Sequence, residues 1–241
     1  MKKFRSKVWR FTKRLLLFLL LSHLIYLVIL KWINPPVTIT QLHSFFTGHG
    51  LKRDYVDMDE ISPNAALAVI ASEDQLFPDH DGFDWKSIQK AIEYNKRKPG
   101  RIKGASTISQ QVAKNVFLWQ GRGWIRKGME VYFTFMIEKI WGKRRILEMY
   151  LNVSEMGDGV FGIEAASRKN FRKAAKNLSR AEAAMIAASM PNPKKFTVKP
   201  LSGFVAGKYP WIMQQMNNLE DDPDIQKIVF PFRNKESAKK K

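Results

Sequence analysis

An uninterrupted apolar segment near the N-terminus constrains this chain more than any other feature. Residues 15–30 contain no Lys, Arg, Asp or Glu, and the apolar character continues past Lys31 to Ile33. At about 1.5 Å per residue, a helix of this length crosses the hydrocarbon core of a bilayer. Residues 15–33 are therefore predicted to form a transmembrane anchor. The alternative is an amphipathic helix lying in the membrane interface, and it is disfavoured because apolar residues surround the whole helix.

The flanks of this segment predict its orientation. The first fourteen residues carry seven positive charges and no acidic residue. Because basic flanks stay on the cytoplasmic side, residues 1–14 are predicted to form a cytoplasmic tail, and the chain after Ile33 to lie outside the cytoplasm. No small-x-small cleavage site follows before Asn34-Pro35-Pro36. We therefore expect an uncleaved anchor and not a signal peptide.

The remaining charge indicates an anionic partner. The net charge is +19, and a net charge of +12 remains when the seven charges of the basic tail are left out. Anionic lipid headgroups or a pyrophosphate substrate fit this sign, whereas nucleic acid is not expected outside the cytoplasm. The chain has no cysteine, which excludes disulfides and thiol catalysis.

The chain after the anchor is predicted to be mainly α-helical. Residues 34–60 are expected to form a linker and a membrane-proximal segment of irregular or β structure, residues 61–200 the main domain, and residues 201–241 a weakly patterned extension. Caps and apolar spacing mark the helices. They are predicted near 62–73, 85–95, 106–115, 124–141, 143–152, 165–171 and 179–190, with a glycine-punctuated loop at 157–162.

An acidic stretch, Glu73 to Asp84, follows the first helix of this domain and holds five carboxylates and one histidine. Glu73 lies four residues after Val69 and three after Ile70, so it extends the apolar stripe of the helix. Burial disfavours the ionised form, so the pKa of Glu73 is predicted to be raised, as suits a proton acceptor near neutral pH. The alternative is that Glu73 and Asp74 merely end a helix above a solvated acidic turn.

Four side chains in this stretch resemble a metal-binding cluster: Asp79, His80, Asp81 and Asp84. A single histidine among acidic residues in a turn is more typical of turn and capping chemistry. We therefore predict no metal site, and expect Asp84 to cap the helix that begins at Trp85.

Amide side chains interrupt the apolar face of the helix near 106–115. Gln111 follows Ile108 by three residues and Asn115 follows Gln111 by four, so both amides share that face. Buried amides need partners, and sugar hydroxyls are suitable ones. A hydrogen-bond network between helices is the alternative. Lys114, on an adjacent face, is a candidate phosphate contact.

A second carboxylate is flanked by cations on the helix over 124–141. Arg126, Lys127 and Glu130 are three and four residues apart and share one face. The simplest interpretation is an exposed helix ion pair. The functional interpretation is a carboxylate kept ionised while Glu73 accepts protons, since two carboxylates with different pKa values are typical of glycosyl-group chemistry.

Four segments in order resemble the motifs of the peptidoglycan glycosyltransferases, glycosyltransferase family 51, which also form the front half of bifunctional penicillin-binding proteins. Residues 73–84 read Glu-Asp-x-x-Phe-x-x-His-x-Gly-Phe-Asp, and residues 104–115 read Gly-Ala-Ser-Thr-Ile-Ser-Gln-Gln-x-x-Lys-Asn. Residues 126–130 read Arg-Lys-x-x-Glu, and residues 146–152 read Ile-Leu-Glu-x-Tyr-Leu-Asn. With no second domain, the chain resembles the monofunctional biosynthetic members of Gram-negative bacteria.

This resemblance implies a lysozyme-like helical domain with a small membrane-proximal lobe, in the periplasm and anchored in the inner membrane. It also implies the reaction, in which lipid II is polymerised into β-1,4-linked glycan with inversion and release of undecaprenyl pyrophosphate. Lipid II and the nascent glycan are the implied partners, and cell-division or cell-wall synthesis proteins are further candidates. The sequence requires no cofactor, although a Mg or Mn ion at the donor pyrophosphate fits the chemistry.

The resemblance assigns roles to residues. Glu73 is the base that deprotonates the acceptor hydroxyl, and Glu130 assists departure of the lipid pyrophosphate. Met129 stands where family members can carry Lys, so the phosphate grip is expected to rely more on the other cations. The substrate-binding residues implied are Lys114, Arg122, Arg126, Lys127, Ser106, Gln110, Gln111 and Asn115. The residues expected to shape the site are Asp74, Phe77, His80, Gly82, Asp84 and Asn152.

Two other functions remain open at this point. A membrane-anchored muramidase or lytic transglycosylase would also use a glutamate of raised pKa, but would cut glycan and need no grip on pyrophosphate. A non-enzymatic scaffold would bind anionic lipid through the basic surface.

Overall fold

The computed structural model describes residues 2–98, 100, 103–121 and 123–230. The chain divides into two compact units, Met1–Pro35 and Pro36–Lys241. Each unit is described by itself.

The first unit is the helix α1 (Lys2–Ile29). Within it, Trp9–Ile29 has a mean hydropathy of 1.8, and by length and composition it is the one helix among the described residues that could cross a membrane. The side chains of residues 15–21 are all exposed, so apolar surface surrounds the helix. This arrangement suits a bilayer-spanning helix, which was predicted, better than an interfacial one. The helix ends at Ile29, earlier than the predicted end at residue 33.

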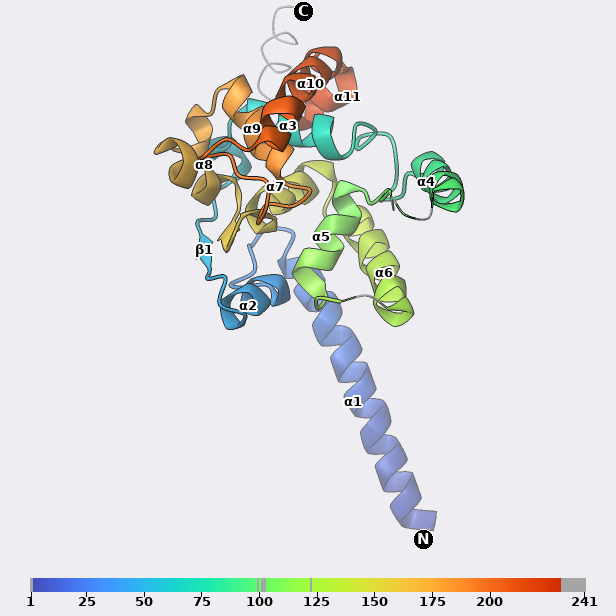
Figure 1. Ribbon diagram of the computed structural model, residues 1–241. Helices are drawn as coiled ribbons and strands as arrows, with labels where there is room; N and C mark the ends of the chain where they lie inside the picture. Colours follow the sequence, from blue (N-terminus) through green and yellow to red (C-terminus); the bar gives the residue numbers. More distant parts are fainter. Residues whose placement is uncertain (1, 99, 101–102, 122, 231–241) are drawn as a thin grey trace, which may run out of the picture. The chain divides into compact units, whose positions relative to one another are not determined.

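The second unit is built mostly of helices (Figure 1). Its α-helices are α2 (Ile39–Phe46), α3 (Pro63–Glu73), α4 (Trp85–Arg97), α5 (Ile108–Phe117), α6 (Trp124–Ile140), α7 (Lys143–Val153), α8 (Ile163–Phe171), α9 (Arg180–Ser189), α10 (Gly203–Leu219) and α11 (Pro223–Val229). Two short 3-10 helices, η1 (Met58–Glu60) and η2 (Ala175–Asn177), and three short strands connect them.

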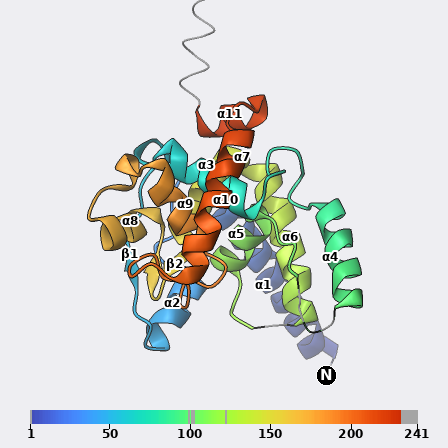
Figure 2. The same ribbon diagram turned by 45° about the horizontal axis from the view of Figure 1, so that its top comes forward.

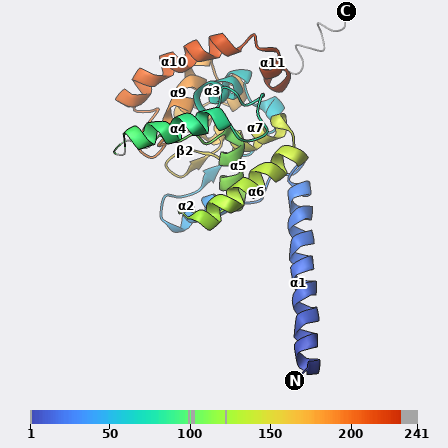
Figure 3. The same cartoon turned by 90° about the vertical axis from the view of Figure 1, so that its right-hand side faces the viewer.

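The core of this unit lies around α3. Every residue of α3 from Ala65 to Ala71 is buried. Helix α10 crosses both α3 and α9 on one side, and α5 packs between α6 and α7 on the other (Figure 2). Figure 3 shows α10 and α6 on opposite sides of the unit, with α3, α5 and α7 between them. The C-terminal end of α3 and the N-terminal half of α5 thus meet inside the unit.

The predicted helix caps are confirmed. The Ser62 hydroxyl accepts the N–H of Asn64 at the start of α3, and the Asp84 carboxylate accepts the N–H of Ser87 at 2.9 Å in α4. A capping box formed by Ser179 and Glu182 opens α9. These caps satisfy backbone donors that the first helical turn leaves free, which explains why the helix starts were readable from sequence.

The segment 157–162, predicted to be a glycine-punctuated loop, is a turn at residues 158–159 between two short strands, so this prediction was wrong for the strand residues. Strands β1 (Lys52–Arg53), β2 (Glu155–Gly157) and β3 (Val160–Phe161) have the order β1-β3-β2. β3 runs parallel to β1 and antiparallel to β2. Gly159 is required in the tight turn, because it has φ +64 and a Cβ there would lie 2.0 Å from the His49 carbonyl oxygen.

Two helical regions differ from the prediction. The segment 34–60, expected to be irregular or β, contains α2, which begins with a capping box of Thr38 and Gln41. The weakly patterned extension contains α10 and α11. The pattern of α10 is weak because Pro210 lies within it and few of its residues are buried.

Candidate active site

Glu73 is the last residue of α3, where the buried helix meets an open cavity. Burial raises the pKa of the Glu73 carboxyl above its ordinary value. Hydrogen bonds from Gln111, at 3.0 Å, and from Ser72 oppose part of this rise, and the charge of Lys114 does so to a smaller extent. The predicted direction of the pKa shift is confirmed, and the alternative of a solvated helix end is wrong for Glu73.

Gln111 links Glu73 to a buried tyrosine on another helix. Its Nε2 donates to Glu73 Oε2, and its Oε1 accepts from the hydroxyl of Tyr150 at 3.3 Å. Burial, followed by the charge of Glu73, raises the pKa of Tyr150 well above its ordinary value, so the phenol stays a donor. Of the two interpretations of the buried amides, the network between helices describes Gln111, which joins α3, α5 and α7.

The Glu73 cavity is the larger of two that adjoin Gln111, with a volume of about 1000 Å³. Its walls come from the end of α3, the turn that follows, α4 and the segment before α5. Ser106, which is exposed, lines it as predicted for a cleft residue. Polar groups from separate segments, including Gln75, Ser87 and Thr107, also face it. The base candidate therefore opens onto a space that accepts a molecule of sugar size.

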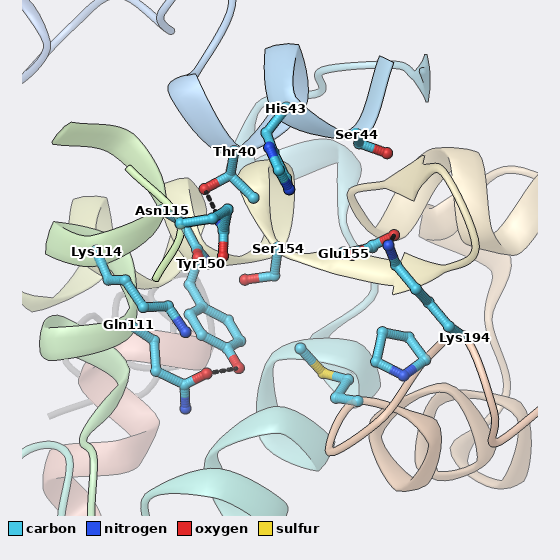
Figure 4. Close-up of a pocket in the computed structure, with 13 residues that line it drawn as sticks. Thr40, His43, Ser44, Gln111, Lys114, Asn115, Tyr150, Ser154, Glu155 and Lys194 are labelled. Carbon is cyan, nitrogen blue, oxygen red and sulfur yellow. Dashed lines mark hydrogen bonds and ion pairs between the residues drawn. The ribbon is translucent and has the colours of Figure 1, made fainter. Parts of the chain in front are cut away.

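The Lys114 cavity lies on the other side of Gln111 and has a volume of about 320 Å³ (Figure 4). Lys114 and Asn115 from α5 and Tyr150 from α7 line it, as does Gln111 itself. Burial lowers the pKa of Lys114, and the nearby charge of Glu130 partly opposes this shift. Gln111 lines both cavities, so it marks their junction.

Glu130 on α6 is buried beside two cations. Its side chain is 5% exposed, with Lys127 Nζ at 2.5 Å and Arg126 Nη1 at 3.5 Å. The simple interpretation of an exposed ion pair is therefore wrong, since Glu130 itself is out of solvent. The Arg126 Nε is buried and has no hydrogen-bond partner among the described residues. An unpaired buried guanidinium nitrogen is costly, and an anionic ligand would satisfy it.

The turn after Glu73 is fixed to the start of α5. Asp74 accepts the backbone N–H of Ile108 at 2.9 Å and the Nε2–H of His80 at 3.0 Å. His80 Nδ1 accepts the N–H of Gly82 at 3.0 Å, so the bonding pattern assigns the proton to Nε2. Phe77 is fully buried with its ring edge to face with His80. These residues position the turn, which is the role predicted for them.

Gly82, Asp84 and Asn152 also have structural placements. Gly82 has φ +88, and a Cβ there would lie 2.7 Å from Thr134 Cγ2. Burial favours a higher pKa for Asp84, but the hydrogen bonds from Ser87 outweigh it and lower that pKa. The buried Asn152 side chain bonds both backbone groups of Val56, at 3.0 and 2.9 Å, and so fixes the segment after β1 to α7.

Arg126 and Lys127 are paired with Glu130 and are not among the described lining residues of either cavity, and two other predicted binding residues lie elsewhere. Gln110 is buried in a capping box with Thr107 and is not among the described lining residues of either cavity. Arg122 lies outside the described residues. The substrate-binding roles of both stay predictions. Among the described residues, no group of three or more His, Asp or Glu side chains is arranged to hold a metal.

Several residues of the site were missed in the sequence. Tyr150 stands in the fourth motif, but no role was predicted for it. His43 and Ser154 also line the Lys114 cavity, and so does Lys194. No local signal distinguishes these three, because α2, α7 and the segment after α9 come together only in the folded chain.

The comparisons with known proteins agree with this geometry. The sequence model of the family described as Transglycosylase matches residues 39–217, which extends beyond the predicted domain at both ends. The chain is 56% identical over 173 residues to proteins named biosynthetic peptidoglycan transglycosylase from Escherichia coli (strain Crooks) and Shigella boydii serotype 4. The match covers 72% of this chain and 72% of each relative. The predicted mainly α-helical, lysozyme-like fold with one apolar N-terminal helix is confirmed. The chain therefore belongs to the transglycosylase family and is a glycosyltransferase.

Proposed function

We propose that this protein is a peptidoglycan glycosyltransferase that polymerises lipid II into β-1,4-linked glycan with inversion, releasing undecaprenyl pyrophosphate. One observation carries the proposal. A glutamate whose pKa is raised by burial, Glu73, lines one cavity, and an adjoining cavity, which shares Gln111 with the first, contains the half-buried cation Lys114. This pairing suits a reaction that needs one base and one site of positive charge.

In the proposed mechanism the acceptor sugar enters the Glu73 cavity. Glu73 removes the proton from its 4-hydroxyl while the hydroxyl oxygen forms the bond to the donor C1. The bond from C1 to the pyrophosphate oxygen breaks in the same displacement, which inverts the configuration at C1. Because pyrophosphate is an activated leaving group, the step needs no strong general acid.

The cations near α5 and α6 compensate the charge that develops on the leaving pyrophosphate. Lys114 and Arg126 lie close enough to influence each other electrostatically, and Lys127 is paired with Glu130. Glu130 assists departure by holding these two α6 cations in place. Because Glu130 is ion-paired with both α6 cations, we propose that Lys114, Arg126 and Lys127 supply positive charge to the leaving group. A Mg or Mn ion at the donor pyrophosphate stays a prediction.

The apolar helix α1 is proposed to anchor the domain in the inner membrane, with the basic tail in the cytoplasm and the catalytic domain in the periplasm. A lipid-linked substrate is confined to the same surface, so anchoring raises its effective concentration. Cell-division and cell-wall synthesis proteins stay predicted partners.

The test is to incubate the purified protein with lipid II in detergent and to separate the products by size. We expect wild type to form polymer, Glu73→Gln to form none, and Glu60→Gln, a matched change at an exposed carboxylate, to behave as wild type. Polymer from Glu73→Gln would exclude Glu73 as the base. Shortening of preformed glycan would instead favour a muramidase or lytic transglycosylase.

A further inference from the structure

Three lysines line a small third cavity of about 70 Å³: Lys169, Lys194 and Lys199. We call this cavity the lysine groove. Lys169 comes from α8, whereas the other two come from the segment between α9 and α10. The turn between β2 and β3 forms another wall of the cavity. Folding thus brings ammonium groups from separate parts of the chain around one depression.

The lysine groove continues from the active site. Pro193 and Lys194 line both the small cavity and the Lys114 cavity. Figure 4 shows Lys194 on the side of the Lys114 cavity opposite Lys114. A ligand held at Lys114 can therefore extend past Lys194 into the groove.

The groove has more positive than available negative charge. Glu155, which lies 3.8 Å from Lys194, also accepts the N–H of Gly159. Asp158 in the wall is paired with His49 at 2.7 Å. Within the described part of the chain, neither Lys169 nor Lys199 has an ion-pair partner. The three exposed lysines outnumber the carboxylates at this depression, so it should attract an anionic ligand.

We propose that the lysine groove binds the carboxylates of the peptide stems on the glycan strand that leads away from the Lys114 cavity. This inference rests on the proposed function, because it needs a donor strand that carries peptides. Separate lysines suit single carboxylates, whereas planar, bidentate recognition of phosphate favours arginine. β2 is one of the two edge strands of the described sheet and lines the same cavity, and an edge strand is a position that an extended peptide can pair with. In the proposed mechanism the pyrophosphate binds at Lys114, so it is not the ligand of the lysine groove.

The experiment compares two substrates on the full chain in detergent. One is lipid II with its natural stem carboxylates, and the other is lipid II whose stem carboxylates are amidated. We expect wild type to have a KM about two- to tenfold lower for the natural substrate, as two partly exposed ion pairs imply, and to form longer chains from it. The double variant Lys169→Gln/Lys199→Gln should lose this preference, while Lys169→Arg/Lys199→Arg should keep it.

A charge-matched control distinguishes an effect of the lysine groove on substrate preference from an effect of the protein's net charge. Lys176→Gln/Lys227→Gln removes two ammonium groups that pair with exposed carboxylates elsewhere, and it should keep the wild-type preference. Equal KM values of wild type for the two substrates would overturn the inference, as would an unchanged preference in the Lys169→Gln/Lys199→Gln variant. Polymer formation from the amidated substrate would in those cases leave the proposed function standing. A wild-type protein that makes no polymer from either substrate would overturn both.

Discussion

Gln111→Leu tests whether Glu73 is the base, because it removes the one strong hydrogen bond to that carboxylate while leaving the carboxylate in place. The bond from Gln111 Nε2 to Glu73 Oε2 is 3.0 Å long and favours the ionised form. A hydrogen bond to a charged group contributes about 1.5–3 kcal/mol. Water in the cavity replaces part of it, so we use the lower end, which corresponds to roughly a tenfold change in the ionisation constant of Glu73.

The sign follows from the form that the bond stabilises. Loss of the bond disfavours the carboxylate, so the pKa of Glu73 rises further, and the acid limb of the profile of kcat/KM against pH moves to higher pH. The assay is the initial rate of polymerisation from lipid II across a pH series. A direct loss of substrate binding through Gln111 would lower the whole profile without moving the limb, so the two effects are separable.

Tyr150→Phe is the matched control. It removes the hydrogen bond that Gln111 accepts but keeps the one that Gln111 donates to Glu73, so we expect a smaller shift of the acid limb. If the Gln111→Leu profile, after scaling, superimposes on the wild-type profile, the assignment of the acid limb to Glu73 is refuted.

Three further predictions concern stability and rate. Burial raises the pKa of Glu73 in the folded protein above its ordinary value of 4.5. As the pH rises above that value, the unfolded chain releases a proton that the folded protein still holds, so the free energy of unfolding falls. Glu73→Gln should therefore raise the free energy of unfolding at pH 7 by about 1 kcal/mol, a gap that should close below pH 4.5 in urea titrations. Lys114→Met should reduce kcat about a hundredfold, because it removes positive charge from the proposed leaving-group site. It should not lower the Tm, because burial disfavours the charged ammonium and so lowers its pKa. A large fall in Tm would contradict this reasoning. Gly82→Ala should lower the free energy of unfolding by about 2–4 kcal/mol, through backbone strain and overlap with Thr134 Cγ2. Adding Thr134→Ser, which removes Cγ2, should recover part of this loss. If the two substitutions lowered the free energy of unfolding additively, the overlap would be contradicted.

The parts of the fold that the sequence predicted well depend on local chemistry. Ser62, Asp84 and Ser179 are capping residues, and each acts within one helical turn. The apolar N-terminal segment is equally local, since its length and composition suffice. Helix α10 was missed because part of its burial comes from α3, which is distant in sequence, and because Pro210 weakens its pattern.

The candidate site also contains features that one helix specifies and features that only the folded chain specifies. The position of Glu73 on the apolar stripe of α3 predicted its raised pKa, because both depend on one helix. The bridge from Glu73 through Gln111 to Tyr150 joins three helices, and no spacing within one helix specifies it. Lys194 joins the Lys114 cavity only because the segment after α9 folds back against β2.

The different surroundings of Glu73 and Glu130 fit the two halves of the proposed glycosyl transfer. Glu73 lies at the end of a buried helix with amide and hydroxyl donors beside it, so burial dominates and its affinity for a proton rises. Glu130 lies between Arg126 and Lys127, so its charge is balanced locally and holds two cations near Lys114. Because Gln111 lines both cavities, the proposed sites of proton removal and leaving-group departure are adjacent, and Lys114 is coupled electrostatically to both Glu73 and Glu130. A cation pair placed beside Glu73 would oppose the rise of its pKa, and without Arg126 and Lys127 the surroundings of Lys114 would lose two cations, so each proposed role depends on its own surroundings.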